Sequence, residues 1–145
     1  MKKYLLLFPI LFTGFIGCDS ENVSEALETQ EPSELLIGTW RTDSSEQYTS
    51  MLCSGEIWNT STAKRYAVVT EDVWAGVEFF NCTLNENQYT WNENGGYGYI
   101  ELSNGSIRNI TAINETEMTY EISSSSYCYK YYLTKVTSVE GCPDL

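Results

Sequence analysis

Hydrophobic and polar residues alternate along most of the chain beyond residue 35. The pattern is clearest near the C-terminal end, where Met118, Tyr120 and Ile122 alternate with Thr119 and Glu121. In the stretch that follows, tyrosines alternate with cysteine, lysine and threonine in the same way. A two-residue period places one set of side chains on each face of a β-strand, so both stretches are predicted to be strands with one buried side.

Short segments of this kind, rich in Tyr, Thr, Val, Ile and Trp, continue through the domain with Gly, Asn and Ser between them. The runs Asn94-Gly95-Gly96 and Asn104-Gly105 indicate hairpin turns, because these residues tolerate positive φ. Consecutive hairpins predict an all-β, antiparallel up-and-down meander that closes into a small β-barrel, since closure removes exposed edges. A two-sheet β-sandwich is the alternative. The predicted strands are 36–42, 47–52, 56–58, 66–70, 73–80, 88–91, 97–102, 106–110, 117–122 and 127–136.

The N-terminal segment has the layout of an export signal. Two lysines precede an uncharged run, residues 4–17, that contains a proline and is too short to span a bilayer. The sequence Phe15-Ile16-Gly17-Cys18 resembles the lipobox of bacterial lipoproteins. The resemblance implies that residues 1–18 form a signal peptide ending at a lipidated Cys18, which anchors the protein in the membrane. The alternatives are a secretory signal with an incidental cysteine and an uncleaved anchor.

Residues 19–34 contain six acids, no base and few apolar side chains. Like-charge repulsion and low apolar content predict a disordered tether, and a short helix over Val23, Ala26 and Leu27 is the alternative. Acids directly after the cysteine also resemble the surface-export signal of Bacteroidota lipoproteins. The remaining residues, 35–145, are enough for one compact domain.

Charge limits the partners that the protein can have. Removing the signal leaves 6 basic and 20 acidic residues, a net charge of −14. Nucleic acid is therefore not expected to bind, because a polyanion needs a basic face. The bases are scattered along the sequence as Arg41, Lys64, Arg65, Arg108, Lys130 and Lys135. We expect a monomer.

Four cysteines remain in the domain: Cys53, Cys82, Cys128 and Cys142. An even number in an exported chain indicates two disulfides. Three pairings are open, and the shorter spacings favour Cys53 with Cys82 and Cys128 with Cys142. A metal site is not expected, because the chain has no histidine and no Cys-x-x-Cys spacing.

The start of the domain, Leu35-Leu36-Ile37-Gly38-Thr39-Trp40, resembles the opening strand of lipocalin-like proteins. The later stretches Ile107–Thr111, Glu115–Tyr120 and Tyr129–Lys135 resemble the small lipocalin-like lipoproteins of Bacteroidota. The resemblance implies that Gly38 and Trp40 plug one end of the barrel. It also implies an outer-membrane lipoprotein, facing the periplasm or the cell surface, that binds a ligand in its interior. The other interpretation of Trp40 is a core tryptophan of any β domain.

Catalysis of the usual triad type is excluded by the absence of histidine, and no cofactor motif is present. Adjacent acids such as Glu71 with Asp72, or Glu115 with Glu117, are common by chance in so acidic a chain, so we expect a protein that is not an enzyme. A hydrolase acting through two carboxylates is a third hypothesis.

The aromatic residues are the more informative feature of the domain. In a small barrel, inward Tyr and Trp can either fill the interior or line a cup that holds one small ligand. We expect a non-enzymatic protein that binds a small apolar or amphipathic ligand inside the barrel. The alternative is a surface interaction module that contacts a protein or a glycan through exposed aromatics. The candidate cavity residues are Trp58, Trp91, Tyr99, Tyr120 and Tyr129.

Overall fold

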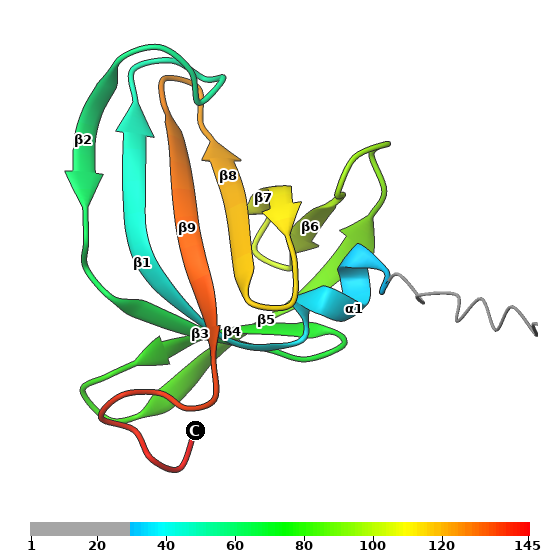
Figure 1. The fold of residues 1–145 in the computed structure, drawn as a ribbon, viewed down its shortest axis with the longest axis vertical. Helices are drawn as coiled ribbons and strands as arrows, with labels where there is room; N and C mark the ends of the chain where they lie inside the picture. The colour runs from blue at the N-terminus through cyan, green and yellow to red at the C-terminus, as the bar shows by residue number, and fades with distance from the viewer. Residues whose placement is uncertain (1–29) are drawn as a thin grey trace, which may run out of the picture.

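A computed structural model describes residues 30–145 and shows an antiparallel β-barrel (Figure 1). The signal peptide, Cys18 and residues 19–29 of the predicted tether lie outside the described residues. A short helix, α1 (Pro32–Leu36), begins within the segment assigned to the tether. The strands that follow are β1 (Gly38–Tyr48), β2 (Ile57–Ser61), β3 (Arg65–Val69), β4 (Val73–Glu78), β5 (Thr83–Asn92), β6 (Tyr99–Leu102), β7 (Ile107–Ile113), β8 (Glu117–Ser123) and β9 (Cys128–Val136).

The barrel closes because β1 pairs along its length with the last strand, β9. From β3 to β9 each strand pairs with the next, so β1 and β3–β9 form a closed eight-stranded barrel. On its other side, β1 pairs with β3 over residues 38–42 and with β2 over residues 45–48. The ninth strand, β2, therefore extends the wall above the closed part (Figure 1). The predicted meander barrel is confirmed, and the sandwich is not formed.

One strand, β1, replaces the two predicted at 36–42 and 47–52, because a β-bulge carries the strand through the polar residues between them. Its register against β9 skips one residue, Asp43, between Thr42 and Ser44. Asp43 accepts hydrogen bonds from Arg41 Nε (2.7 Å) and Thr134 Oγ1 (2.5 Å). The extra residue reverses the alternation, as bulges do.

The outer face of the same wall carries a second polar cluster. Glu46 accepts hydrogen bonds from the hydroxyls of Tyr48 (2.6 Å) and Tyr132 (2.8 Å). The bond from Tyr48 and then that from Tyr132 lower the pKa of Glu46 below its ordinary value.

One end of the barrel is closed by α1 and Trp40. Leu36 and Trp40 are fully buried, and Trp40 Nε1 donates to the Leu36 carbonyl at 2.7 Å. Lys135 Nζ donates to the Leu35 carbonyl at 3.0 Å and lies 5.1 Å from the centroid of the Trp40 ring. Two side chains of the barrel thus bind the carbonyls at the end of the helix, which would otherwise lack partners.

The two disulfides join Cys53 to Cys128 and Cys82 to Cys142. The expected pairing of sequence neighbours is wrong. Barrel closure sets the first bond, because β9 begins opposite the end of β1 and so brings Cys128 beside the β1–β2 loop that holds Cys53. The second bond ties the C-terminal segment to the β4–β5 turn. That segment packs Val139 on the outer side of the barrel.

Candidate functional site

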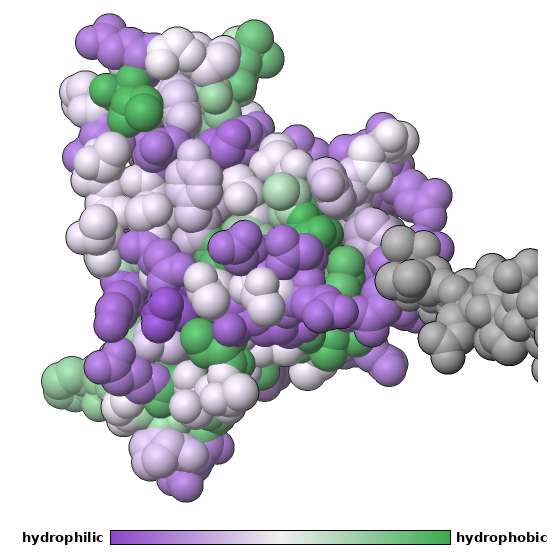
Figure 2. Space-filling model, in the orientation of Figure 1, coloured by the Kyte–Doolittle hydropathy of each residue, from purple (hydrophilic) through white to green (hydrophobic). Residues whose placement is uncertain are grey.

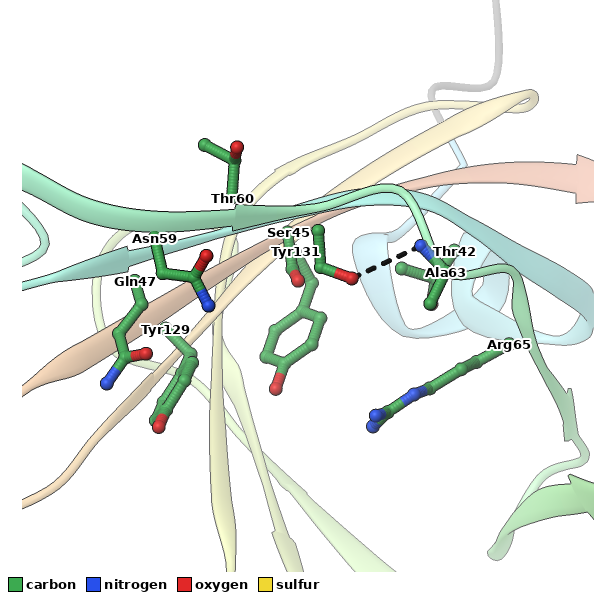
Figure 3. Close-up of a pocket in the computed structure, with 10 residues that line it drawn as sticks. Thr42, Ser45, Gln47, Asn59, Thr60, Ala63, Arg65, Tyr129 and Tyr131 are labelled. Atoms are coloured by element: carbon green, nitrogen blue, oxygen red, sulfur yellow. Dashed lines mark hydrogen bonds between the residues drawn. The ribbon is translucent and has the colours of Figure 1, made fainter.

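The concave face of β1, β2 and β9 forms a polar cleft of about 260 Å³, here called the outer cleft. Figure 3 shows Gln47 of β1, Asn59 of β2, Arg65 of β3, and Tyr129 and Tyr131 of β9 projecting into the same space. The wall is built mainly of hydroxyls and amides, so it offers both hydrogen-bond donors and acceptors. Its residues are Thr42, Ser45, Gln47, Asn59, Thr60, Ser61, Ala63, Arg65, Tyr129 and Tyr131.

A second space of about 230 Å³, here called the inner cavity, lies deeper in the barrel. Thr42, Arg65 and Tyr131 line both spaces, so they form the boundary between them. The inner lining is more aromatic and apolar than the outer one. It consists of Thr42, Arg65, Tyr66, Ala67, Trp74, Gly76, Arg108, Tyr120, Ile122, Tyr131 and Leu133.

Strand alternation positions these side chains. In β9, Tyr129, Tyr131 and Leu133 face the interior, and in β8 Tyr120 and Ile122 do so, as the sequence pattern predicts. In β1 the bulge at Asp43 matters. Thr42 before it, and Ser45 and Gln47 after it, all line the cleft although they differ in parity.

Four aromatic rings lead from the inner cavity to the outer cleft. Trp74 meets Tyr120 edge to face at 5.7 Å between centroids, and Tyr120 stacks on Tyr131 at 4.8 Å. Tyr131 in turn lies 6.4 Å from Tyr129. Burial raises the pKa of the Tyr120 hydroxyl, although the nearby Arg108 charge opposes this rise. Burial also raises the pKa of Tyr131, against the opposing charges of Arg65 and Arg108.

Arg108 is the most unusual group in the site. Its Cζ lies 4.5 Å from the Trp74 ring centroid and 5.6 Å from that of Tyr120. Its Nε and Nη1 atoms are buried, and they find no acceptor among residues 30–145. Buried polar atoms are nearly always hydrogen-bonded, so these two unsatisfied N–H groups beside a cavity favour an acceptor in that space. No carboxylate lines either space.

The sequence-predicted residues Tyr120 and Tyr129 lie in the site, whereas Trp58, Trp91 and Tyr99 do not. Trp58 is 66% exposed on β2, where it alternates with Asn59 of the cleft. Tyr99 alternates with the buried Ile100, so it points away from the core. Trp91 packs against the core beside α1, where it lines a separate depression. A one-residue shift in the alternation along a strand is enough to move an aromatic ring from the cavity to the surface.

Sequence reasoning missed Arg108, Arg65, Trp74 and Tyr131. The sequence held a signal for Arg108: it lies two residues before the buried Ile110 in β7, so the two side chains share the inward face. An arginine in that phase is out of place in an apolar core.

Two other arrangements do not form sites. Cys53, Cys128 and Glu121 lie close together, but the two sulfurs are bonded to each other and are therefore not thiolate ligands. Glu71 and Asp72 are exposed in the β3–β4 turn.

The chain matches no protein-family model and no curated protein. Within residues 30–145, no helix has both the length and the apolar character that crossing a bilayer requires.

Proposed function

We propose that this protein is a lipocalin-like lipoprotein of the bacterial cell envelope that binds a small amphipathic ligand at the open end of its barrel. The observation that carries the proposal is the pair of adjoining spaces at that end, one aromatic and one polar. Pockets that combine an apolar lining with a few polar groups are the usual form of small-molecule sites. Two disulfides indicate an extracytoplasmic location, which agrees with the proposed export.

The two linings favour an amphipathic ligand over a purely apolar one. An apolar molecule could contact Trp74, Tyr120 and Leu133 in the inner cavity. In the outer cleft it would displace water from Gln47 and Asn59 without replacing the lost hydrogen bonds, at a cost in affinity. A ligand with an apolar face and several polar groups satisfies both regions.

Membrane attachment is part of the proposal and has its own test. Cells that make the full-length chain are grown with an alkyne-bearing palmitate, and the label on the protein is measured. We expect wild type to be labelled and to sediment with membranes, and Cys18→Ser to lose the label. Equal labelling of the two proteins would contradict the anchor, although the barrel's binding function would still stand.

Gly76 gives a direct test of the pocket. It lines the inner cavity, and a Cβ built there meets no atom within 4 Å. Gly76→Leu therefore places a branched side chain in the space proposed for the ligand. The matched control is Gly96→Leu, which adds the same side chain on an exposed loop.

Native mass spectrometry of each protein, purified from its own host, measures the retained small molecule. We expect wild type and the Gly96 variant to carry an adduct that the Gly76 variant lacks. An adduct retained equally by all three proteins, or found on none, would refute binding at this end of the barrel.

A second candidate function rests on an exposed apolar tip. Figure 2 shows apolar side chains at the top of the molecule, over the β1–β2 loop. Met51, Leu52, Ile57 and Trp58 are exposed there, with Leu52 at 81%. The Cys53–Cys128 bond fixes this loop to the β8–β9 turn. Exposed apolar patches favour contact with a partner protein or glycan, so Leu52→Ser should weaken such a contact without removing the adduct.

A further inference from the structure

The basic side chains of the described residues fall into two groups: those that bind an acceptor on the protein and those that do not. Arg41, Lys64 and Lys130 each have a carboxylate oxygen within 4.0 Å. Lys135 donates to the end of α1. Arg65 and Arg108 have neither kind of partner among residues 30–145, and both line the inner cavity. In a chain of net charge −12, the two unpaired arginines therefore share one cavity that no acid lines.

The surroundings of Arg108 hold its charge in place without neutralising it. Trp74 and Tyr120 flank the guanidinium, whose Cζ lies within about 6 Å of both ring centroids. The N–H groups on Nε and Nη1 lie in the plane of the guanidinium and have no acceptor. An aromatic ring is at best a weak acceptor for those N–H groups, whereas an oxyanion would satisfy them through charge-assisted hydrogen bonds.

We infer that Arg108 is the centre of an anion subsite and that the ligand is a small hydroxylated carboxylate, such as an acidic sugar. This inference rests on the proposed binding function and specifies its ligand. The carboxylate binds at Arg108, with Arg65 at the boundary between the two spaces. The ring of the ligand lies against Tyr131, and its hydroxyls bond to Gln47 and Asn59 in the outer cleft.

The polar outer wall distinguishes this ligand from a fatty acid. A long acyl chain with its carboxylate at Arg108 would run outward along Ser45, Gln47 and Asn59, where it would leave amides and hydroxyls without partners. A hydroxylated body makes use of the same groups, and tyrosine rings accept the apolar face of a sugar ring.

The test uses two sugars that differ at one carbon, D-glucuronate and D-glucose, titrated into the full-length protein by calorimetry. Wild type should bind glucuronate at least about tenfold more tightly than glucose, because a charge-assisted hydrogen bond is worth that factor or more. Arg108→Met keeps the length of the side chain and removes its charge, so it should bind the two sugars equally. The control Arg41→Met also removes one positive charge, from an arginine that is paired with Asp43, and should keep the preference.

Thermal stability separates a binding role from a structural one. Arg108 has no ion pair, and two of its buried nitrogens lack an acceptor among residues 30–145, so the melting temperature of ligand-free Arg108→Met should be unchanged or higher. If the arginine instead serves the fold through its ring contacts, the variant should melt at a lower temperature and keep the sugar preference. That result would overturn the subsite.

Other outcomes also decide the inference. Equal binding of both sugars by wild type would overturn the anion subsite, and binding of neither would overturn the ligand class. A neutral adduct that is lost from Gly76→Leu but kept by Arg108→Met would overturn the inference while the proposed function stands. If no adduct is found on wild type and neither sugar binds, both the anion subsite and the proposed binding function are refuted.

Discussion

Replacing Trp40 with phenylalanine tests how the closed end of the barrel is held. The indole is fully buried and donates to the Leu36 carbonyl, which is itself buried. Phenylalanine keeps a ring but has no donor, so that carbonyl loses its partner at a cost of about 1–3 kcal/mol. The smaller ring adds a cavity term, since full truncation of a buried aromatic costs about 3–5 kcal/mol. Together we expect Trp40→Phe to lower the free energy of unfolding by about 2–4 kcal/mol.

The free energy of unfolding is measured in guanidinium and the melting temperature on heating, both by circular dichroism with the two disulfides intact. A loss of that size should lower the melting temperature by roughly 10–20 °C in a domain of this length. Trp58→Phe is the matched control: it makes the same chemical change at a site that is 66% exposed, so its effect should stay within about 0.5 kcal/mol. If the two variants unfold alike, Trp40 does not hold α1 on the barrel and the account of the plug is wrong.

Three further perturbations test the fold. Replacing Cys82 and Cys142 together with alanine opens a loop with a sequence separation of 60, which predicts a loss of about 4 kcal/mol in chemical unfolding. Hydrogen bonds from two tyrosines lower the pKa of Glu46, so its contribution to stability is present above its ordinary pKa and is lost as the pH falls. Glu46→Gln should therefore show a smaller fall in unfolding free energy between about pH 5 and pH 3 than wild type. Gly38 has φ +141° and lies against the Lys135 side chain, so Gly38→Ala should cost about 1–3 kcal/mol in thermal unfolding; an unchanged melting temperature would contradict this.

The parts of the fold that the sequence predicts well are those where alternation runs without interruption. The pairing of β8 with β9 is regular, and the inward faces of both strands follow from the residue pattern alone. Tyr120 and Tyr129 could be assigned to the interior for this reason. The barrel as a whole follows from the number of hairpins and from the absence of strong helical periodicity.

The parts that could not be predicted depend on bulges and on barrel closure. The extra residues Asp43 in β1 and Thr111 in β7 each shift the register, and a bulge leaves no distinct mark in a polar stretch. The disulfide partners follow from the contact between β1 and β9, strands at opposite ends of the domain. Sequence distance carries no information about that contact. The phase of Arg108 could be inferred from Ile110, but its contacts with Trp74 and Tyr120 on other strands became known only from the structure.

Partway along its length, β1 changes its pairing partner from β3 to β2. The sheet is therefore closed at the level of β3 and open along the outer edge of β2. Within the described chain, β2 has β1 as its only neighbour, so its far row of amides faces solvent (Figure 1). Amide hydrogens on the outer edge of β2 should therefore exchange with deuterium quickly, and those within the closed eight-stranded barrel should exchange slowly. Displacing β2 would break only its pairing with β1, so the proposed ligand could enter past this strand while the eight-stranded barrel stays closed.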